Sequence, residues 1–89
     1  MDIIRKHFIF EGYVQGVGFR WKTYHTARRF GLSGWVRNLD NGDVEMEAEG
    51  SRADIEALLS VLESHTWSQI DRIRSETVPV QGGYSFEII

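Results

Sequence analysis

The sequence has no cysteine, a single proline and no long apolar run. The lack of cysteine excludes a disulfide framework, a thiol nucleophile and a zinc–thiolate site. No apolar stretch approaches the roughly 18 residues of a membrane-spanning helix, and the one near the N-terminus is too short for a secretory signal. We therefore expect a cytoplasmic protein that depends on its core alone and has no membrane partner.

An excess of positive charge is also missing, since the formal net charge at pH 7 is −3. General binding to nucleic acid or to an anionic membrane needs a basic face, and the acidic balance argues against both. The 89 residues suffice for one domain, covering residues 1–89, but not for two. Any anion that binds must therefore be attracted by a local arrangement of groups.

Hydrophobic patterns of two different periods predict the order βαββαβ, followed by a short terminal strand. The strands are expected at residues 5–14, 32–38, 43–50, 70–78 and 84–89. The helices are expected to begin at Phe19 and directly after Ser51, with Gly31 ending the first and Asp54 completing the cap of the second. This order predicts an α+β fold, a ferredoxin-like α/β sandwich with both helices on one face of a mostly antiparallel sheet.

The third expected strand has the clearest alternation. Asn41-Gly42, just before it, is a strong hairpin signal, and the strand's apolar and acidic residues predict a buried face and a solvent face. The apolar set is Val44, Met46 and Ala48, and the acidic set is Asp43, Glu45, Glu47 and Glu49. In the last strand, Tyr84, Phe86 and Ile88 are expected to share one side.

The loop after the first expected strand, within GYVQGVGFR at residues 12–20, has the properties of an anion-binding site. Gly16 and Gly18 permit positive φ angles and leave the backbone accessible, and the N–H groups of the next helical turn have no intrahelical partners. Arg20 adds a planar guanidinium that matches two phosphate oxygens. The strands that flank the first helix of a split βαβ unit are parallel, so Asn38 should face the same crevice. These residues predict a site for phosphate or a similar oxyanion, with a glycine-hinged turn beside a surface arginine as the alternative.

Two motifs in these regions resemble the acylphosphatase family. The first, G-x-V-Q-G-V-x-F-R, lies at residues 12–20, and the second, G-W-V-x-N-x-x-x-G-x-V with a glycine six residues on, lies at residues 34–50. The resemblance implies an α/β sandwich that hydrolyses the carboxyl–phosphate anhydride of a small-molecule acyl phosphate to a carboxylate and inorganic phosphate. We expect no nucleic acid, no metal or other cofactor, and a monomeric protein.

Carried over to this sequence, the resemblance implies that Arg20 binds the phosphate and that Asn38 positions the attacking water, which makes both the expected catalytic residues. The residues expected to bind the phosphate through their backbone, beside Arg20, are Gln15, Gly16, Val17, Gly18 and Phe19. An asparagine amide does not titrate usefully, so Asn38 is expected to fix a water and not to act as a base. Because an acyl phosphate is already activated, fixed donors around its phosphoryl group are a sufficient catalyst.

Other residues with chemical potential are interpreted as structural. His7, His25 and His65 are possible bases, but none has an expected carboxylate partner at the crevice, so exposed or capping roles are preferred. The acidic row of the third strand could bind a metal, but it is interpreted as a solvent face paired with basic neighbours. Trp21 and Trp35 flank the expected site, where they either shape a pocket for the acyl group or only pack.

Two further function classes are compatible with the predicted element order. One is an acylphosphatase-like module that binds an anion or a partner without turnover. The other is an RNA-binding sheet, but RNA-recognition domains place aromatic side chains where this chain has its acidic row. Carboxylates there would repel phosphate, so RNA binding is disfavoured.

Overall fold

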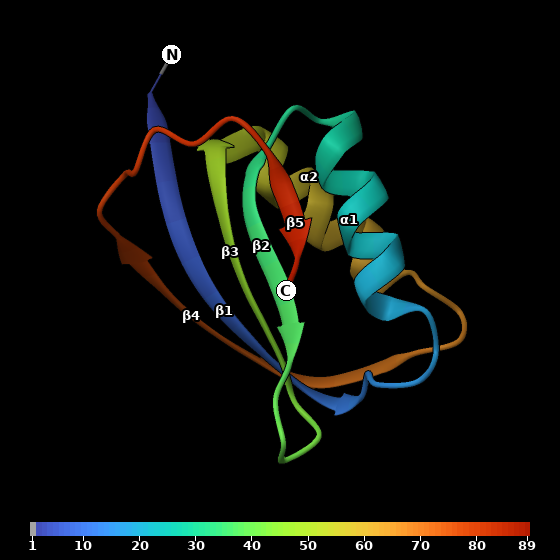
Figure 1. Cartoon of the computed structure of the whole chain (residues 1–89). Helices are drawn as coiled ribbons and strands as arrows, with labels where there is room; N and C mark the ends of the chain where they lie inside the picture. Colours follow the sequence, from blue (N-terminus) through green and yellow to red (C-terminus); the bar gives the residue numbers. More distant parts are fainter. Residues whose placement is uncertain (1) are drawn as a thin grey trace.

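The computed structural model describes residues 2–89 and contains the elements in the predicted order. They are β1 (Ile3–Tyr13), α1 (Phe19–Arg29), β2 (Ser33–Asn38), β3 (Val44–Ser51), α2 (Arg52–Glu63), β4 (Gln69–Val78) and β5 (Phe86–Ile88). Figure 1 shows both helices lying on one face of a curved sheet. The predicted ferredoxin-like α/β sandwich is therefore confirmed.

The sheet has the strand order β4-β1-β3-β2-β5. β3 pairs antiparallel with both β1 and β2, so β1 and β2 run parallel to each other. β1 also pairs antiparallel with β4, and β2 pairs parallel with β5. The C-terminal ends of β1 and β2 therefore lie at one edge of the sheet, the lower edge in Figure 1, as expected of a split βαβ unit.

The hydrophobic core lies between the sheet and the two helices. Val44, Met46 and Ala48 of β3 are fully buried, as their alternation predicts. The helices contribute apolar faces at helical spacing. Their buried residues include Phe19, Thr23 and Ala27 from α1 and Ile55, Leu58 and Leu62 from α2. Phe19 packs edge-on against Phe10 of β1, with ring centroids 5.2 Å apart, and this contact fixes the start of α1 against the sheet.

The expected helix signals are present. Ser51 Oγ accepts a hydrogen bond of 3.1 Å from the backbone N–H of Asp54 at the start of α2. Gly31, just after α1, has a φ of 70°. The two helices have 11 and 12 residues, and none in the described part of the chain is long and apolar enough to cross a bilayer.

The connection between β2 and β3, residues 39–43, contains the predicted Asn41-Gly42 signal, and we call it the hairpin turn. Its ends are joined by a hydrogen bond of 2.8 Å from Leu39 N to Asp43 O. The turn begins directly after Asn38, the last residue of β2, which pairs with Val44.

The sheet face that points away from the helices differs from the prediction at one end. The alternation predicts Glu49 in solvent, but Glu49 is only 5% exposed and Arg5 beside it only 3%. The chain between β4 and β5 covers both, because these strands lie at opposite edges of the sheet and their connection must cross between them (Figure 1). The backbone N–H groups of Gln81 and Gly82, in this connection, donate hydrogen bonds of 2.7 and 2.9 Å to the Glu49 carboxylate.

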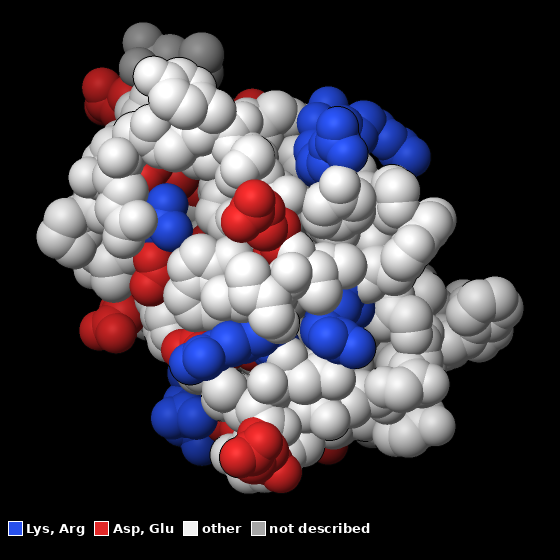
Figure 2. Space-filling view, viewed as in Figure 1, with Lys and Arg blue, Asp and Glu red and all other residues white. Residues whose placement is uncertain are grey.

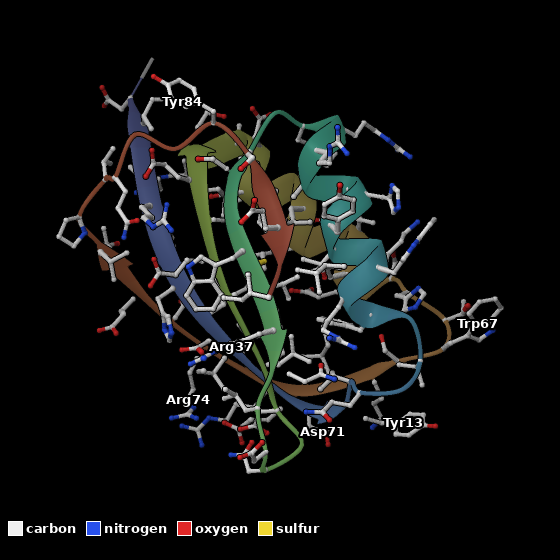
Figure 3. The ribbon with its side chains drawn as sticks, in the orientation of Figure 1. Tyr13, Arg37, Trp67, Asp71, Arg74 and Tyr84 are labelled. Atoms are coloured by element: carbon white, nitrogen blue, oxygen red, sulfur yellow. The ribbon has the colours of Figure 1, made fainter. Side chains whose placement is uncertain are left out.

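β5 is shorter than the expected last strand, and the prediction that Tyr84 shares a side with Phe86 and Ile88 is wrong. The pairing with β2 begins only where Gly34 N donates a hydrogen bond of 2.9 Å to Ser85 O. Tyr84 precedes this point and is fully exposed at the upper end of the molecule (Figure 3), whereas Phe86 is buried.

Candidate active site

The connection between β1 and α1, residues 14–18, forms a loop that we call the glycine loop. Gly16 and Gly18 have φ angles of 74° and 79°, in the left-handed region that disfavours other residues. A β-carbon at either position would meet no described atom within 4 Å, so the restriction comes from the backbone conformation and not from packing. The glycine loop therefore holds a conformation that its two glycines make accessible, with free space above it.

The N-terminus of α1 faces this space without a side-chain cap. Gly18 is the N-cap residue, this end of the helix has no side-chain cap hydrogen bond within the described part of the chain, and the first turn carries no acidic residue. The N–H groups of that turn have no intrahelical acceptors, and the helix dipole places partial positive charge there. The end of α1 is thus suited to an anion.

A cavity of about 200 Å³ lies above the glycine loop at the start of α1. It is lined by Val14, Gly16, Gly18, Phe19, Arg20, Trp21, Asn38 and Ile88. Five of the predicted site residues therefore meet here, although Asn38 comes from a different element. The other two do not line the cavity, because the Gln15 side chain bonds to the hairpin turn and Val17 packs against the core.

Arg20 contributes the positive charge at this cavity. It lies half-buried in the first turn of α1. None of the ion pairs formed within residues 2–89 involves Arg20, although Arg5, Arg37 and Arg74 all pair with glutamates. Its guanidinium N–H groups are therefore available to a bound anion.

Asn38 contributes an unpaired acceptor on the other side of the cavity. Its Oδ1 atom is buried and accepts no hydrogen bond from any residue in the described range 2–89. Buried polar atoms in folded proteins are nearly always hydrogen-bonded, so an exception calls for an explanation. An amide oxygen that lines a cavity together with Arg20 is suited to accept a hydrogen bond from a small molecule there.

Ile88 and Val14 were not predicted to belong to the site. Ile88 reaches it because β5 pairs parallel with β2 and places Ile88 beside Val36, two residues before Asn38. The apolar alternation of the last strand indicated only that Ile88 faces inward. Its place at the cavity depends on β5 being the neighbour of β2, which the alternation does not specify.

The three histidines lie outside the cavity lining. His7 bonds to Glu45 on the opposite face of the sheet, with 2.7 Å between Nε2 and Oε2. The His25 ring packs on Trp21, with centroids 3.7 Å apart. His65 lies nearer, with Nε2 3.4 Å from the carbonyl oxygen of Val17. None of the three has its ring at the cavity that Arg20 and Asn38 share.

The two tryptophans lie in different environments. Trp21 lines the cavity and is 63% exposed, so it forms part of the cavity mouth. Trp35 pairs with Glu47 across β2 and β3, on the opposite sheet face, and lies under the Arg37 guanidinium at 5.6 Å. A contribution of Trp35 to an acyl pocket is therefore not supported by its position.

The acidic row of β3 is paired with basic side chains, as interpreted from the sequence. Arg5 Nε lies 2.6 Å from Glu47 Oε1, and Arg37 Nε lies 2.6 Å from Glu45 Oε1. Arg37 extends from β2 on the side of the sheet away from α1 (Figure 3). No group of three potential metal ligands occurs among residues 2–89.

Two of these glutamates have lowered pKa values. Burial raises the pKa of Glu45, but its hydrogen bonds to His7 and Arg37 outweigh this, so the pKa lies below the ordinary value of 4.5. The hydrogen bond from the N–H of Gln81 lowers the pKa of Glu49, and further bonds from Gly82 and Arg5 overcome the opposing effect of burial. Both carboxylates are thus ionised partners that stabilise the fold, away from the cavity.

A larger groove of about 780 Å³ runs between α1 and β5. Its walls include Tyr24 and Arg28 of α1, and it shares Ile88 with the smaller cavity. Arg28 donates a hydrogen bond of 2.7 Å to Tyr24 Oη, and the groove contains no residue of the glycine loop. The smaller cavity, and not the larger groove, therefore has the arrangement of donors suited to phosphate.

The surface charge is mixed on the face shown in Figure 2. Basic and acidic side chains alternate there with uncharged surface, and they do not form one continuous basic area. Because the net charge is −3, any attraction of an anion to the cavity must come from local groups.

The fold and these motifs are those of one family. The acylphosphatase family model matches residues 6–88. The chain is 42% identical over 80 residues to an acylphosphatase of Bifidobacterium longum, covering 89% of this chain and 82% of the relative. It is 35% identical to an acylphosphatase of Moorella thermoacetica, covering 99% and 96% of the two chains. Among solved structures, an acylphosphatase of Coxiella burnetii superposes with a TM-score of 0.91 at 31% identity, covering 99% of this chain and 94% of that one. The protein therefore belongs to the acylphosphatase family.

Proposed function

We propose that the protein is an acylphosphatase, which hydrolyses the carboxyl–phosphate anhydride of small acyl phosphates to a carboxylate and inorganic phosphate. The observation that carries the proposal is the meeting of Arg20 and Asn38 at one cavity above the glycine loop, in a chain of this family. One side of the cavity supplies positive charge and N–H donors, and the other supplies an unpaired amide oxygen. These are the groups that a hydrolysis of an activated phosphate requires.

In the proposed reaction, the phosphoryl group lies over the glycine loop. Backbone N–H groups of Gln15 to Phe19 surround its oxygens, and the dipole of α1 adds partial positive charge. Arg20 binds two of the oxygens through its planar guanidinium. Charge that gathers on the phosphoryl oxygens in the transition state is stabilised by donors that are already in place.

Asn38 holds the attacking water in this mechanism. Its Oδ1 accepts a hydrogen bond from the water, whose oxygen attacks phosphorus in line with the carboxylate that leaves. The bond from phosphorus to the carboxylate oxygen breaks as the bond to water forms. The water's proton passes to a phosphate oxygen of the substrate, so the products are a carboxylate and inorganic phosphate. The acyl part lies at the cavity mouth, against Trp21 and Ile88.

A monomer acting in the cytoplasm is part of the same proposal. Both edges of the sheet carry features that oppose strand pairing with another copy. β5 has only three residues, and β4 carries charged residues along its length, namely Asp71, Arg72, Arg74 and Glu76. A small domain without cysteine also fits a reducing compartment.

A non-catalytic anion-binding module is the weaker alternative. Such a module would use the glycine loop and Arg20, but it would have no use for the buried, unpaired oxygen of Asn38. The named relatives that this chain covers over most of their length are acylphosphatases. Both observations favour the enzyme.

Release of inorganic phosphate from acetyl phosphate tests the proposal. We expect turnover by the purified protein that continues in excess chelator and is abolished by Arg20→Ala. A rate no higher than that of buffer alone would contradict the proposed function. Activity that is lost in chelator and restored by Mg²⁺ would contradict the metal-free mechanism.

A further inference from the structure

The side chain of Gln15 connects the two halves of the candidate active site. Gln15 directly precedes Gly16 in the glycine loop. Its Nε2 atom donates hydrogen bonds of 2.7 Å to Leu39 O and 2.8 Å to Asp43 O, both in the hairpin turn. These residues are 24 and 28 positions away in the sequence.

The chemistry of the partners determines the orientation of this amide. Both acceptors are backbone carbonyl oxygens, so only the NH₂ end of the glutamine can face them. The same two carbonyls also take part in the turn itself, because Leu39 N bonds to Asp43 O and Gly42 N bonds to Leu39 O. Gln15 therefore holds both ends of the hairpin turn from the side of the glycine loop.

The hairpin turn begins directly after Asn38, whose Oδ1 atom accepts no hydrogen bond from the described residues. On the β3 side, Asn38 is held by its pairing with Val44. On the turn side, the first residue beyond it is Leu39, which Gln15 holds. Beyond the pairing of both β1 and β2 with β3, the Gln15 side chain therefore links the glycine loop directly to the turn that follows Asn38.

We infer that Gln15 is a positioning residue, which keeps Asn38 in register with the bound phosphoryl group through the hairpin turn. This inference rests on the proposed function, since it assigns Gln15 to the alignment of the attacking water. This side-chain role is distinct from the proposed backbone role of Gln15 in phosphate binding, because the side chain bonds to the hairpin turn. A misplacement of about 1 Å between reacting groups can lower a rate by about 100-fold.

Gln15→Met tests the inference, because methionine has a similar length but no N–H donors. We expect kcat for acetyl phosphate to fall by about 10- to 100-fold. The dissociation constant of inorganic phosphate should stay within about threefold, because Arg20 and the loop backbone are unchanged. Gln15→Ala is measured as well, because it removes the same donors without introducing a methionine side chain that could pack differently.

Asn41→Ala is the matched control. Asn41 also binds the hairpin turn through its side chain, with 3.0 Å between Asp43 N and Asn41 Oδ1, but it is exposed and does not reach the glycine loop. It should lower the melting temperature about as much as Gln15→Met while leaving kcat near that of the wild type. If both variants lose activity equally, or if Gln15→Met and Gln15→Ala lose stability without losing kcat, Gln15 has only a structural role.

The Asn38→Ala background gives the sharpest readout. If Gln15 acts through Asn38, then adding Gln15→Met to Asn38→Ala should lower kcat by less than about threefold, because effects of residues that act as a unit are not additive. A full additional loss in the double variant would overturn the inference. Failure of the proposed function would be distinct, since the wild type itself would then release no phosphate.

Discussion

At the scale of single residues, the site depends on two side chains that the fold leaves unpaired. Within the described residues, the guanidinium of Arg20 forms none of the ion pairs that occupy other arginines. The amide oxygen of Asn38 is buried and accepts no hydrogen bond from residues 2–89. We propose that a bound ligand pairs with both groups.

Arg20→Lys separates charge from geometry at this position. Lysine keeps the positive charge but cannot bind two phosphate oxygens through a planar fork. We expect kcat/KM for acetyl phosphate to fall by about 100-fold or more, near the effect of Arg20→Ala and on the scale of losing one preorganised donor. Melting temperatures should change little, because Arg20 has no ion-pair partner among residues 2–89 to lose.

Arg29→Lys, at the exposed C-terminal end of the same helix, is the control and should be fully active. Near-normal turnover by Arg20→Lys would show that two-point binding of phosphate is not required.

The sequence predicted that Arg20 and Asn38 meet at one cavity, but it did not predict all of the contacts around them. Arg20 and Asn38 were predicted from motif and topology, because parallel strands end at one edge whatever their exact lengths. The side-chain role of Gln15 was not, because it depends on contacts with a turn more than 20 positions away. The place of Ile88 depends on β5 pairing with β2, which the apolar pattern does not encode.

At the scale of elements, the connection between β4 and β5 is held to the sheet by a buried carboxylate. Arg5 and Glu49 form a nearly buried pair, and Glu49 also accepts hydrogen bonds from Gln81 and Gly82 in this connection. The connection leads into β5, which brings Ile88 to the cavity. The buried carboxylate thus anchors the chain that completes the site.

Glu49→Gln tests this anchor through the pH dependence of stability. Because hydrogen bonds lower the pKa of Glu49 below its ordinary value of 4.5, its carboxylate stabilises the fold above that pH, and the stabilisation is lost as the pH falls through the lowered pKa. We expect the variant to lose about 2 kcal/mol at pH 7. Below about pH 4.5, its free energy of unfolding should fall less steeply than that of the wild type.

Denaturant titrations at several pH values measure both effects, and Glu56→Gln, on the exposed surface of α2, is the control. Equal slopes for Glu49→Gln and the wild type in acid would contradict the anchoring role.

The burial of Glu49 could not be predicted from the pattern of β3 alone. Alternation along β3 correctly assigned Val44, Met46 and Ala48 to the core and the glutamates to the opposite face. It assumed that this face is open. The cover comes from a segment 32 to 33 residues later in the chain, which crosses the sheet because β4 and β5 lie at opposite edges.

At the scale of the whole molecule, a protein of net charge −3 is proposed to bind an anion. Basic and acidic groups alternate on the surface shown in Figure 2, so long-range attraction contributes little. The proposed binding therefore depends on the short-range donors of the glycine loop, the end of α1 and Arg20.

Phosphate should therefore stabilise the folded protein. At a free concentration 100 times the dissociation constant, mass action gives about 2.7 kcal/mol. For a domain of this size, that corresponds to a rise in melting temperature of roughly 10–20 °C. Sodium chloride of equal ionic strength should not reproduce the rise, and Arg20→Ala should remove it. A melting temperature that stays constant across millimolar phosphate would contradict a preformed anion site.

The central claim is that Asn38 positions the attacking water while Arg20 and the glycine loop hold the phosphate. The most direct test measures kcat for acetyl phosphate and the dissociation constant of inorganic phosphate on Asn38→Ala. The account predicts that kcat falls by about 10²–10³-fold, the effect of deleting one preorganised polar group. Phosphate affinity should stay within a few-fold, and stability should be kept, because the deleted oxygen has no protein partner among residues 2–89. A kcat near that of the wild type, with a lowered melting temperature, would contradict the water-positioning role and reduce Asn38 to a residue that shapes the hairpin turn.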